Sequence, residues 1–242
     1  MSGFGRRRLY LMRHGHVDYF APGLTDPRFV ELTDLGKEQA AAAHTALADV
    51  SFDLVAHSGL PRTIATAAIV CGEENDKEPV DEPRLEELKS GWLQANSREE
   101  LAARLAFCFD KADVSGARFL PDGETFAEAE ARIVAGIRSI VEDHDWKTAL
   151  VVAHEGVNRI LLGWACGGGL KTIGAFEQDL CCINVVDIDV TPSEADGSPQ
   201  VERAIIKAIN LTPYDTVKEG LPRTSLEHLF GVDFGASRPS AG

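Results

Sequence analysis

The sequence predicts an α/β fold, a three-layer α/β/α sandwich in which helices cover both faces of a mainly parallel central sheet. Segments typical of strands alternate with segments typical of helices along the chain. Several of the strand-like segments are continuously apolar, as expected for strands buried on both faces. The 242 residues show no internal repeat and no long linker. We therefore expect one domain over 1–242, with its core at about 7–210.

Apolar periodicity and turn residues predict four elements in the first part of the chain: a strand at 7–14, a helix at 33–49, a strand at 52–58 and a helix at 61–72. Thr33 or Asp34 can cap the first helix at its N-terminus. Pro61 suits the first position of the second helix, and Gly72 suits the position after its last turn. A short strand is expected around Val80, within an acidic loop.

The second part of the chain continues the pattern: helices at 97–112 and 124–143, a strand at 148–156, a helix at 157–168, and strands at 182–190 and 203–210. The run TALVVAHEG at 148–156 is the clearest strand in the sequence. Composition becomes mixed beyond Thr212. We expect the C-terminal tail at 213–242 to be partly disordered, chiefly in its final GASRPSAG.

Composition and charge exclude some classes of partner. The 24 basic and 38 acidic residues give a formal net charge of −14. A nucleic-acid-binding domain normally carries a basic face, so no nucleic-acid partner is expected. An anionic small molecule remains compatible with this charge if basic residues gather around it locally. No apolar run approaches the ~20 residues that span a bilayer, so no membrane partner is expected.

The N-terminus and the cysteines indicate a compartment. The basic run at 6–8 is followed by too few apolar residues before Arg13 for a secretory signal. The cysteines are odd in number and show no CxxC spacing: Cys71, Cys108, Cys166, Cys181 and Cys182. This pattern favours thiols in a reducing compartment over disulfides or a zinc site. We expect a cytoplasmic protein.

Polar side chains gather where the predicted strands end. The first strand ends in Arg13 and His14, the second in His57 and Ser58, and the clearest strand in His154, while Arg62 lies one turn into a helix. Taken alone, Arg62 fits a surface position and His154 fits a hydrogen-bonded strand end. Ligands of such sheets, however, bind at the carboxyl ends of the strands. If these polar side chains meet at that edge, we expect a binding site, because burying charged groups that have no partner costs free energy.

Arginines and histidines around one point suit a phosphoryl group. The guanidinium fork matches phosphate oxygens, and a neutral histidine can attack phosphorus to form a phosphohistidine. A carboxylic acid with a raised pKa would then protonate the leaving oxygen. The alternative is a zinc site made from His14, His16, His57, His154 and carboxylates. Nearby arginines would repel the cation, so no metal is expected.

Six sequence blocks in consistent order resemble the histidine phosphatase superfamily, the phosphoglycerate-mutase-like proteins, and specifically its larger branch. The similarity covers roughly 7–190. The blocks are LYLMRHG at 9–15, LTDLGKEQA at 32–40, SGLPRTIATA at 58–67, RLEELKSGWLQ at 84–94, DGET at 122–125 and LVVAHEGVNRILL at 150–162. The resemblance implies a phosphoglycerate mutase-like fold and a phosphoric monoester hydrolase that acts without cofactor or metal.

The resemblance also implies a role for each matching residue. His14 is expected to be the phosphorylated nucleophile, and Arg13, Arg62 and His154 are expected to form the phosphate pocket. Glu87 is expected to be the proton donor. The family spacing L–x–E–x–x–x–G selects Glu87 rather than Glu86. We expect Glu86 to lie in a solvent-exposed acidic turn.

Departures from the family pattern favour a phosphatase over a mutase. Val17 and Phe20 stand where mutases have a hydroxyl residue and an asparagine, and the mutase arginine pair is replaced by isolated Arg98 and Arg104. The resemblance therefore implies transfer of the phosphoryl group to water from a small phosphorylated metabolite. Two alternatives stay open: a phosphoglycerate mutase-type phosphotransferase, and a catalytically silent phospho-ligand-binding protein.

Further residues are expected near the substrate. Glu155 replaces a glycine found in many members, and it either narrows the site and selects the substrate or points into solvent. Gly156 lets the backbone approach the phosphate. His16, with Tyr19 and Phe20, is expected to line an outer pocket suited to a nonpolar or ring-containing leaving group; simple loop packing is the alternative. A homodimer is conceivable if the strand at 182–190 lies at a sheet edge, unless the tail covers that edge.

Overall fold

A six-stranded sheet organises the part of the chain that the computed structural model describes, residues 4–72, 76–89, 100 and 107–230. The strand order is β3-β2-β4-β1-β5-β6. The strands are β1 (Gly5–Arg13), β2 (Leu54–His57), β3 (Val80–Asp81), β4 (Thr148–Ala153), β5 (Ile183–Pro192) and β6 (Pro199–Leu211). The predicted strands at 7–14, 52–58, 182–190 and 203–210 are therefore confirmed, with shifted ends.

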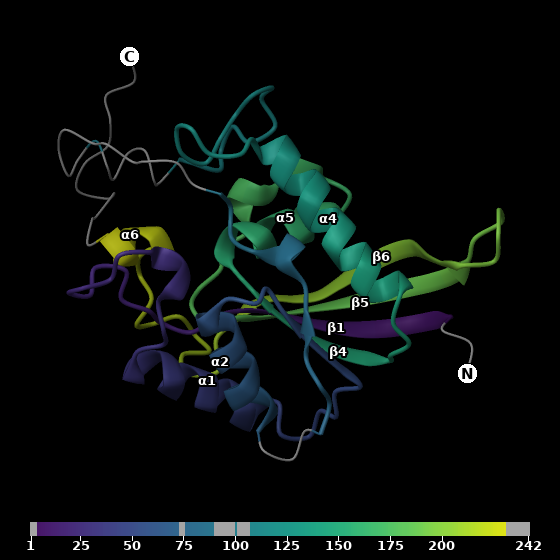
Figure 1. Ribbon diagram of the computed structural model, residues 1–242, viewed down its shortest axis with the longest axis horizontal. Helices are drawn as coiled ribbons and strands as arrows, with labels where there is room; N and C mark the ends of the chain where they lie inside the picture. Colours follow the sequence, from purple (N-terminus) through teal and green to yellow (C-terminus); the bar gives the residue numbers. More distant parts are fainter. Residues whose placement is uncertain (1–3, 73–75, 90–99, 101–106, 231–242) are drawn as a thin grey trace.

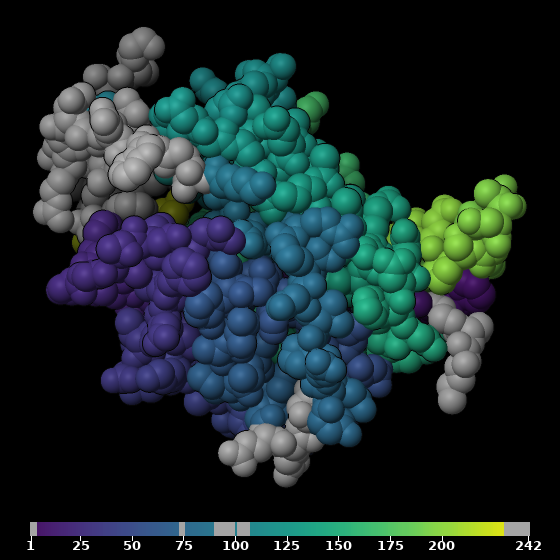
Figure 2. All heavy atoms as spheres, in the orientation of Figure 1, coloured from purple at the N-terminus to yellow at the C-terminus, as the bar shows by residue number. Residues whose placement is uncertain are grey.

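The sheet is mixed rather than uniformly parallel. β1, β4, β2 and β3 pair in parallel, whereas β1–β5 and β5–β6 pair in antiparallel fashion. The short connection between β5 and β6 can join antiparallel strands only, since a parallel pair needs a long crossover. Figure 2 shows this hairpin projecting from the right of the molecule. β6, not β5, occupies the edge, so the interpretation of 182–190 as an edge strand is wrong, and dimerisation stays a prediction.

Helices cover both faces of the sheet, which confirms the three-layer architecture (Figure 1). α1 and α2 lie on one side and α4 and α5 on the other. The helices are α1 (Asp34–Ala46), α2 (Pro61–Cys71), α4 (Phe126–Glu142), α5 (Glu155–Ala165) and α6 (Ser225–Phe230), with 3-10 turns η1 (Pro27–Phe29), η2 (Pro83–Leu85), η3 (Gly169–Lys171) and η4 (Ile173–Ala175). Among the described helices, none combines the length and apolar character needed to cross a bilayer.

Consecutive residues of β4 explain why its sequence is continuously apolar. Val151 packs in a core with Ile137 of α4 and Ile160 of α5, whereas Val152 packs with Ala43 of α1. Successive strand side chains point to opposite faces, so a strand between two helical layers needs apolar residues at every position. The same strand must change character where it leaves the sheet, and it does so at His154.

Two predicted boundaries are wrong. The predicted strand at 148–156 ends at Ala153, and α5 begins at Glu155 rather than at 157. His154 is the extended N-cap residue of α5, and its carbonyl accepts the first helical hydrogen bond, from the amide of Asn158 at 2.9 Å. Residues 107–112 of the helix predicted at 97–112 form turns, because their amides bond three residues back. The part at 97–106, apart from residue 100, lies outside the described residues.

The described part of the C-terminal tail is ordered by specific contacts. Thr224 and Glu227 cap α6 reciprocally, with hydrogen bonds of 2.8 Å from the Thr224 amide and 3.3 Å from the Glu227 amide. In Figure 1, α6 lies at the opposite end of the sheet from the N-terminus, near the carboxyl end of β1. The final GASRPSAG, at 235–242, for which disorder was chiefly predicted, lies outside the described residues.

Candidate active site

The carboxyl ends of β1 and β4 place two histidines side by side. Arg13 pairs with Ala153 in the parallel register, so the next residue of each strand, His14 and His154, leaves the sheet at the same level. The His14 amide donates to the Ala153 carbonyl at 3.1 Å. The two imidazole rings have centroids 5.2 Å apart and planes at 65°. The predicted convergence of strand ends is therefore present in the structure.

His14 is held as a neutral ring with one nitrogen available for attack. Its Nδ1–H donates to the Gly15 carbonyl at 2.7 Å, which leaves the lone pair on Nε2. Burial and the positive charges of Arg62 and Arg13 lower the pKa of His14 well below its ordinary value. Gly15 permits this geometry because a Cβ there would lie 2.5 Å from the carbonyl oxygen of Gly36 in α1.

Arg13 and Arg62 are buried, and each is held in place by hydrogen bonds from Nη1 of its guanidinium group. Arg13 donates through Nη1 to the Gln178 carbonyl at 2.6 Å. Arg62, the second residue of α2, donates through Nη1 to the carbonyls of Pro27 and Arg28 at 3.3 and 3.4 Å. The Nε atoms of Arg13 and Arg62 are buried without a hydrogen-bond partner in the described structure. The anchoring fixes both cations while leaving donors for a ligand.

A hydroxyl relay sets the tautomer of His154. Its Nε2 lies 2.8 Å from Oγ of Ser58, which lies 3.0 Å from Oγ1 of Thr63. Thr63 donates its own proton to the Leu60 carbonyl at 2.8 Å, so it accepts from Ser58, and Ser58 accepts from Nε2–H of His154. Nδ1 of His154 then carries the lone pair. Burial is the main cause that lowers the pKa of His154 well below its ordinary value; the neighbouring ring of His14, which could not be charged at the same time, and the charges of Arg62 and Arg13 lower it further.

Three buried nitrogens around His14 lack partners among the described residues: Nε of Arg13, Nε of Arg62 and Nδ1 of His154. Buried polar groups are nearly always hydrogen-bonded, so three together indicate a ligand that completes them. The two guanidinium groups require an acceptor with negative charge. A phosphoryl group supplies several such oxygens, and protonation of His154 at Nδ1 would add a third donor.

The side chains of Arg13, Arg62 and His154 around His14 are called the cradle below. Glu87 approaches this cradle from the loop after η2. Its Oε1 accepts the Leu88 amide at 2.9 Å. Burial is the main cause that raises the pKa of Glu87, and the nearby negative charge of Glu155 raises it further. Gly156 makes room for the carboxyl, because a Cβ there would lie 2.8 Å from Oε1 of Glu87. By contrast, Glu86 forms an ion pair of 3.0 Å with the exposed Arg28.

Glu155 points inward, so the alternative in which it faces solvent is wrong. The residue is 3 % exposed. Its Oε2 lies 3.1 Å from Nη1 of Arg13 and accepts from Oγ of Ser225 at 2.6 Å, while Oε1 accepts from Nη2 of Arg159 at 2.9 Å. Both oxygens are engaged by the protein. The geometry therefore makes Glu155 a positioning residue for Arg13.

Comparison with known proteins decides the family. The profile of the histidine phosphatase superfamily (branch 1) matches residues 9–195, including the two histidines and both arginines of the cradle. The chain belongs to this superfamily. The Escherichia coli (strain K12) adenosylcobalamin/alpha-ribazole phosphatase is 32% identical over 75% of this chain and 90% of that protein.

Other relatives of this histidine phosphatase family member extend the comparison. The 2-carboxy-D-arabinitol-1-phosphatase of Triticum aestivum is 27% identical over 97% of this chain, and the chain spans 47% of that protein. The chain thus spans less than half of the plant relatives it matches. The crystal structure of the alpha-ribazole phosphatase from Shigella flexneri superposes with a TM-score of 0.60 at 30% identity, covering 80% of this chain and 95% of that one.

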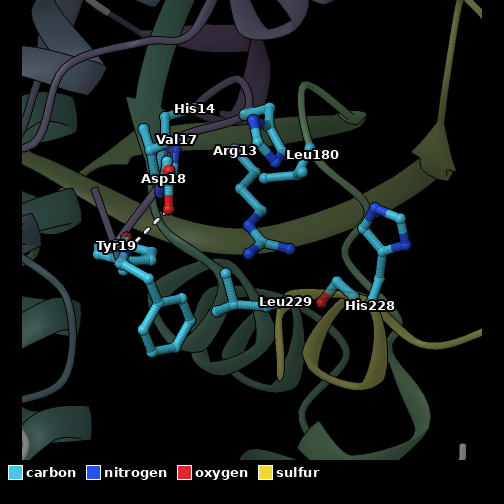
Figure 3. Close-up of a pocket in the computed structure, with 11 residues that line it drawn as sticks. Arg13, His14, Val17, Asp18, Tyr19, Leu180, His228 and Leu229 are labelled. Carbon is cyan, nitrogen blue, oxygen red and sulfur yellow. Dashed lines mark hydrogen bonds between the residues drawn. The ribbon is translucent and has the colours of Figure 1, made fainter. Parts of the chain in front are cut away.

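The residues predicted to line the outer pocket divide into different environments. His16 donates to or accepts from Oγ1 of Thr33 through Nδ1 at 2.8 Å and lines a cavity of about 100 Å³ with Arg13 and His14. Figure 3 shows the Arg13 guanidinium extending toward Leu229 of α6 in this cavity. The Arg62 guanidinium carbon lies 5.8 Å from the Tyr19 ring centroid. His16 and Tyr19 therefore pack against neighbouring residues and also line cavities next to the candidate active site.

His57 does not join the cradle, although its strand end was predicted to contribute. Its Nδ1 lies 2.8 Å from Oδ1 of Asp81, on the neighbouring strand β3. Within the described ranges, no group of three or more His, Cys, Asp or Glu side chains is arranged to hold a metal ion. The residue from this strand end that reaches the site is Ser58, which was predicted to lie at the strand end but was given no role there.

Three other residues that shape the site were missed. Arg159 carries a signal in retrospect, because it follows Glu155 by four residues on one helix face. Gln178 and Ser225 carry none. Gln178 acts through its backbone carbonyl, and Ser225 lies in a tail whose composition predicted partial disorder.

Proposed function

We propose that this chain is a metal-independent phosphomonoesterase that hydrolyses a small phosphorylated metabolite through a phosphohistidine on His14. The observation that carries the proposal is a set of buried nitrogens, from Arg13, Arg62 and His154, that surround a neutral imidazole and find no hydrogen-bond partner in the described part of the chain. The phosphatase names of the relatives support the same reaction. The small volume beside His14 favours a small-molecule substrate over a macromolecule.

In the first step, Nε2 of His14 attacks phosphorus, and the bond between phosphorus and the ester oxygen breaks. The protonated carboxyl of Glu87 gives its proton to the departing oxygen, so an alcohol leaves. Arg13 and Arg62 donate to the non-bridging oxygens as negative charge redistributes, and His154 adds a third donor once its Nδ1 has taken the proton of a monoanionic phosphate ester. The burial that raises the pKa of Glu87 keeps this proton available at higher pH than for an ordinary glutamate.

In the second step, water replaces the alcohol and the roles of Glu87 reverse. The Glu87 carboxylate takes a proton from water, whose oxygen attacks phosphorus, and the bond to Nε2 of His14 breaks. Inorganic phosphate leaves, His14 returns to its neutral form, and Glu87 regains its proton. The two fixed guanidinium groups supply the positive charge that a metal ion supplies in other phosphoryl-transfer sites.

Phosphate release in the presence of a chelator tests the proposal. With 4-nitrophenyl phosphate and excess EDTA, we expect unchanged activity and one inorganic phosphate released for each nitrophenol. A loss of activity that added divalent metal restores would contradict the metal-independent reaction. With 3-phosphoglycerate, isomer formation without phosphate release would instead support the mutase alternative.

The proton-donor role of Glu87 predicts a leaving-group effect. Glu87→Gln should lower kcat for alkyl phosphates by about 10²- to 10⁴-fold, because an alkoxide is a poor leaving group without a proton. The loss should be much smaller for 4-nitrophenyl phosphate, whose phenolate leaves unprotonated. Steady-state phosphate release with both substrates measures the difference. Glu38→Gln, on the exposed face of α1, is the control.

The shifted pKa values also predict the shape of the pH profile. The lowered pKa of His14 keeps the nucleophile neutral down to acidic pH, and the raised pKa of Glu87 keeps the acid protonated above its ordinary range. Activity on alkyl phosphates should therefore peak on the acidic side of neutrality and fall as Glu87 deprotonates. Glu87→Gln should remove this alkaline fall; a fall that persists would assign it to another group.

A further inference from the structure

A second cavity opens directly onto the reacting groups. It has a volume of about 580 Å³, and its lining includes Arg13, His14, Arg62 and Glu87. Because Glu87 is the proposed donor to the leaving oxygen, the space beside it is where the rest of the substrate must lie. The chemistry of the other lining residues therefore bears on the class of substrate.

Much of the remaining lining is apolar, and its leucines and phenylalanines other than Phe20 are buried or half-buried. It includes Leu60, Leu88, Phe109, Phe119, Leu226 and Leu229. Of these, Leu60, Leu88, Phe109 and Leu226 are at most 9 % exposed. The charged lining residues Arg28 and Lys89 are instead exposed, and Arg28 is paired with Glu86. Apart from the reacting groups and the buried Glu155, the charged lining residues are thus partly or fully exposed, whereas buried leucines and Phe109 form much of the inner wall.

The aromatic part of this wall is rigidly supported. Phe109 and Phe119 stack with centroids 5.5 Å apart and planes at 24°. The guanidinium carbon of Arg159 lies 4.7 Å from the Phe109 ring centroid. Arg159 is itself fixed by Glu155, the residue that also holds Arg13. The apolar wall and the phosphate cradle therefore share one buried support.

The C-terminal helix α6 supplies part of the lining, through Leu226 and Leu229. Ser225 fastens it by two hydrogen bonds, from Oγ to Glu155 at 2.6 Å and from its amide to Glu177 at 3.0 Å. α6 lies beyond residue 195, where the match to the family ends. This part of the cavity is thus built by a segment outside the matched region of the histidine phosphatase family.

We propose that α6 completes a leaving-group subsite for phosphate monoesters whose alcohol carries an uncharged, apolar ring. The proposal deepens the phosphatase function above and rests on its placement of the phosphoryl group at His14. A flat ring gains from burial against leucines and stacked phenylalanines. A charged or many-hydroxyl leaving group would lose its hydration against the leucines and phenylalanines of this wall, whose side chains offer no hydrogen-bond partner.

Paired substrates with similar alcohol leaving groups test the subsite. We expect kcat/KM for 3-phenylpropyl phosphate to exceed that for glycerol 3-phosphate by about tenfold or more, consistent with burial of a phenyl ring. Leu229→Asp should reduce this ratio to near one, because it places a carboxylate in the apolar lining. Val217→Asp, at a position of the same tail that is 79 % exposed, should leave the ratio and the activity unchanged.

Two outcomes would overturn the proposal: a wild-type ratio near one, or a ratio that Leu229→Asp leaves intact. Ser225→Ala provides a second variant in case Leu229→Asp fails to fold. It removes the hydroxyl bond to Glu155 with little change in volume, and the ratio should fall several-fold because α6 is less firmly held. An unchanged ratio in folded Ser225→Ala protein would contradict the role of Ser225 in the subsite.

Binding of non-hydrolysable phosphonates separates this proposal from the proposed reaction. In calorimetry, 3-phenylpropylphosphonate should bind the wild type about tenfold more tightly than propylphosphonate. Preference for the phenyl compound in a protein that hydrolyses no ester would support the subsite and contradict the phosphatase function. Hydrolysis of all the esters with equal phosphonate affinities would contradict the subsite and leave the phosphatase function standing.

Discussion

His14→Ala is expected to lower kcat for 4-nitrophenyl phosphate by about four orders of magnitude or more, as removal of a nucleophile does in other covalent mechanisms. Nε2 of His14 is the proposed attacking atom, and alanine offers no nitrogen in its place. Inorganic phosphate release under multiple-turnover conditions measures the loss.

Trapping of the intermediate makes this prediction specific. Wild-type protein quenched in base during turnover of labelled substrate should carry acid-labile, base-stable phosphate, and His14→Ala protein should carry none. His44→Ala, at an exposed position in the last turn of α1, is the matched control and should retain both signals. Substantial turnover by His14→Ala, or labelling that survives the substitution, would exclude His14 as the nucleophile.

Arg62→Ala should lower kcat/KM by about 10²- to 10³-fold, the usual effect of removing a preorganised donor to developing negative charge. Its Nη1 is held by two backbone carbonyls of the η1 segment, and its buried Nε lacks a partner among the described residues. The cation therefore needs no rearrangement when the phosphoryl group binds. Steady-state kinetics and the inhibition constant of inorganic phosphate should both show the loss.

Arg62→Lys distinguishes the shape of the guanidinium from its charge. An ammonium group can hold either the carbonyls or the phosphoryl oxygens, so lysine should restore only a small part of the activity. Arg203→Ala on β6 removes an exposed cation that pairs with Asp189, and it should leave the kinetics unchanged. Full activity in Arg62→Lys would show that net charge alone accounts for the effect.

The local elements of this fold were predictable because their signals are local. Thr33 accepts the Gly36 amide and caps α1, and Pro61 begins α2, as short-range sequence patterns indicate. The predicted start of α5, at 157, is wrong because the helical residues GVNRILL follow closely on the strongly apolar run of β4. Strand and helix propensities do not distinguish His154, at the end of the strand, from Glu155, at the start of the helix.

The convergence of His14, Arg62 and His154 was also predictable, because parallel strands deliver their carboxyl ends to one edge. The orientation of Glu155 was not. Two opposite outcomes were compatible with a glutamate at that position, and the decision came from Arg13, Arg159 and Ser225, whose donors reach the carboxylate from three segments of the chain.

The sequence by itself thus determined the layered fold, the strand ends that meet and the residue types of the phosphate cradle. All of these follow from the alternation of apolar segments and from motifs a few residues long. The tertiary structure decided which atoms remain available at the site and what surrounds the leaving group. Those depend on hydrogen bonds such as Arg13 to Gln178 and Ser225 to Glu155, which join segments 165 and 70 residues apart and have no local signature.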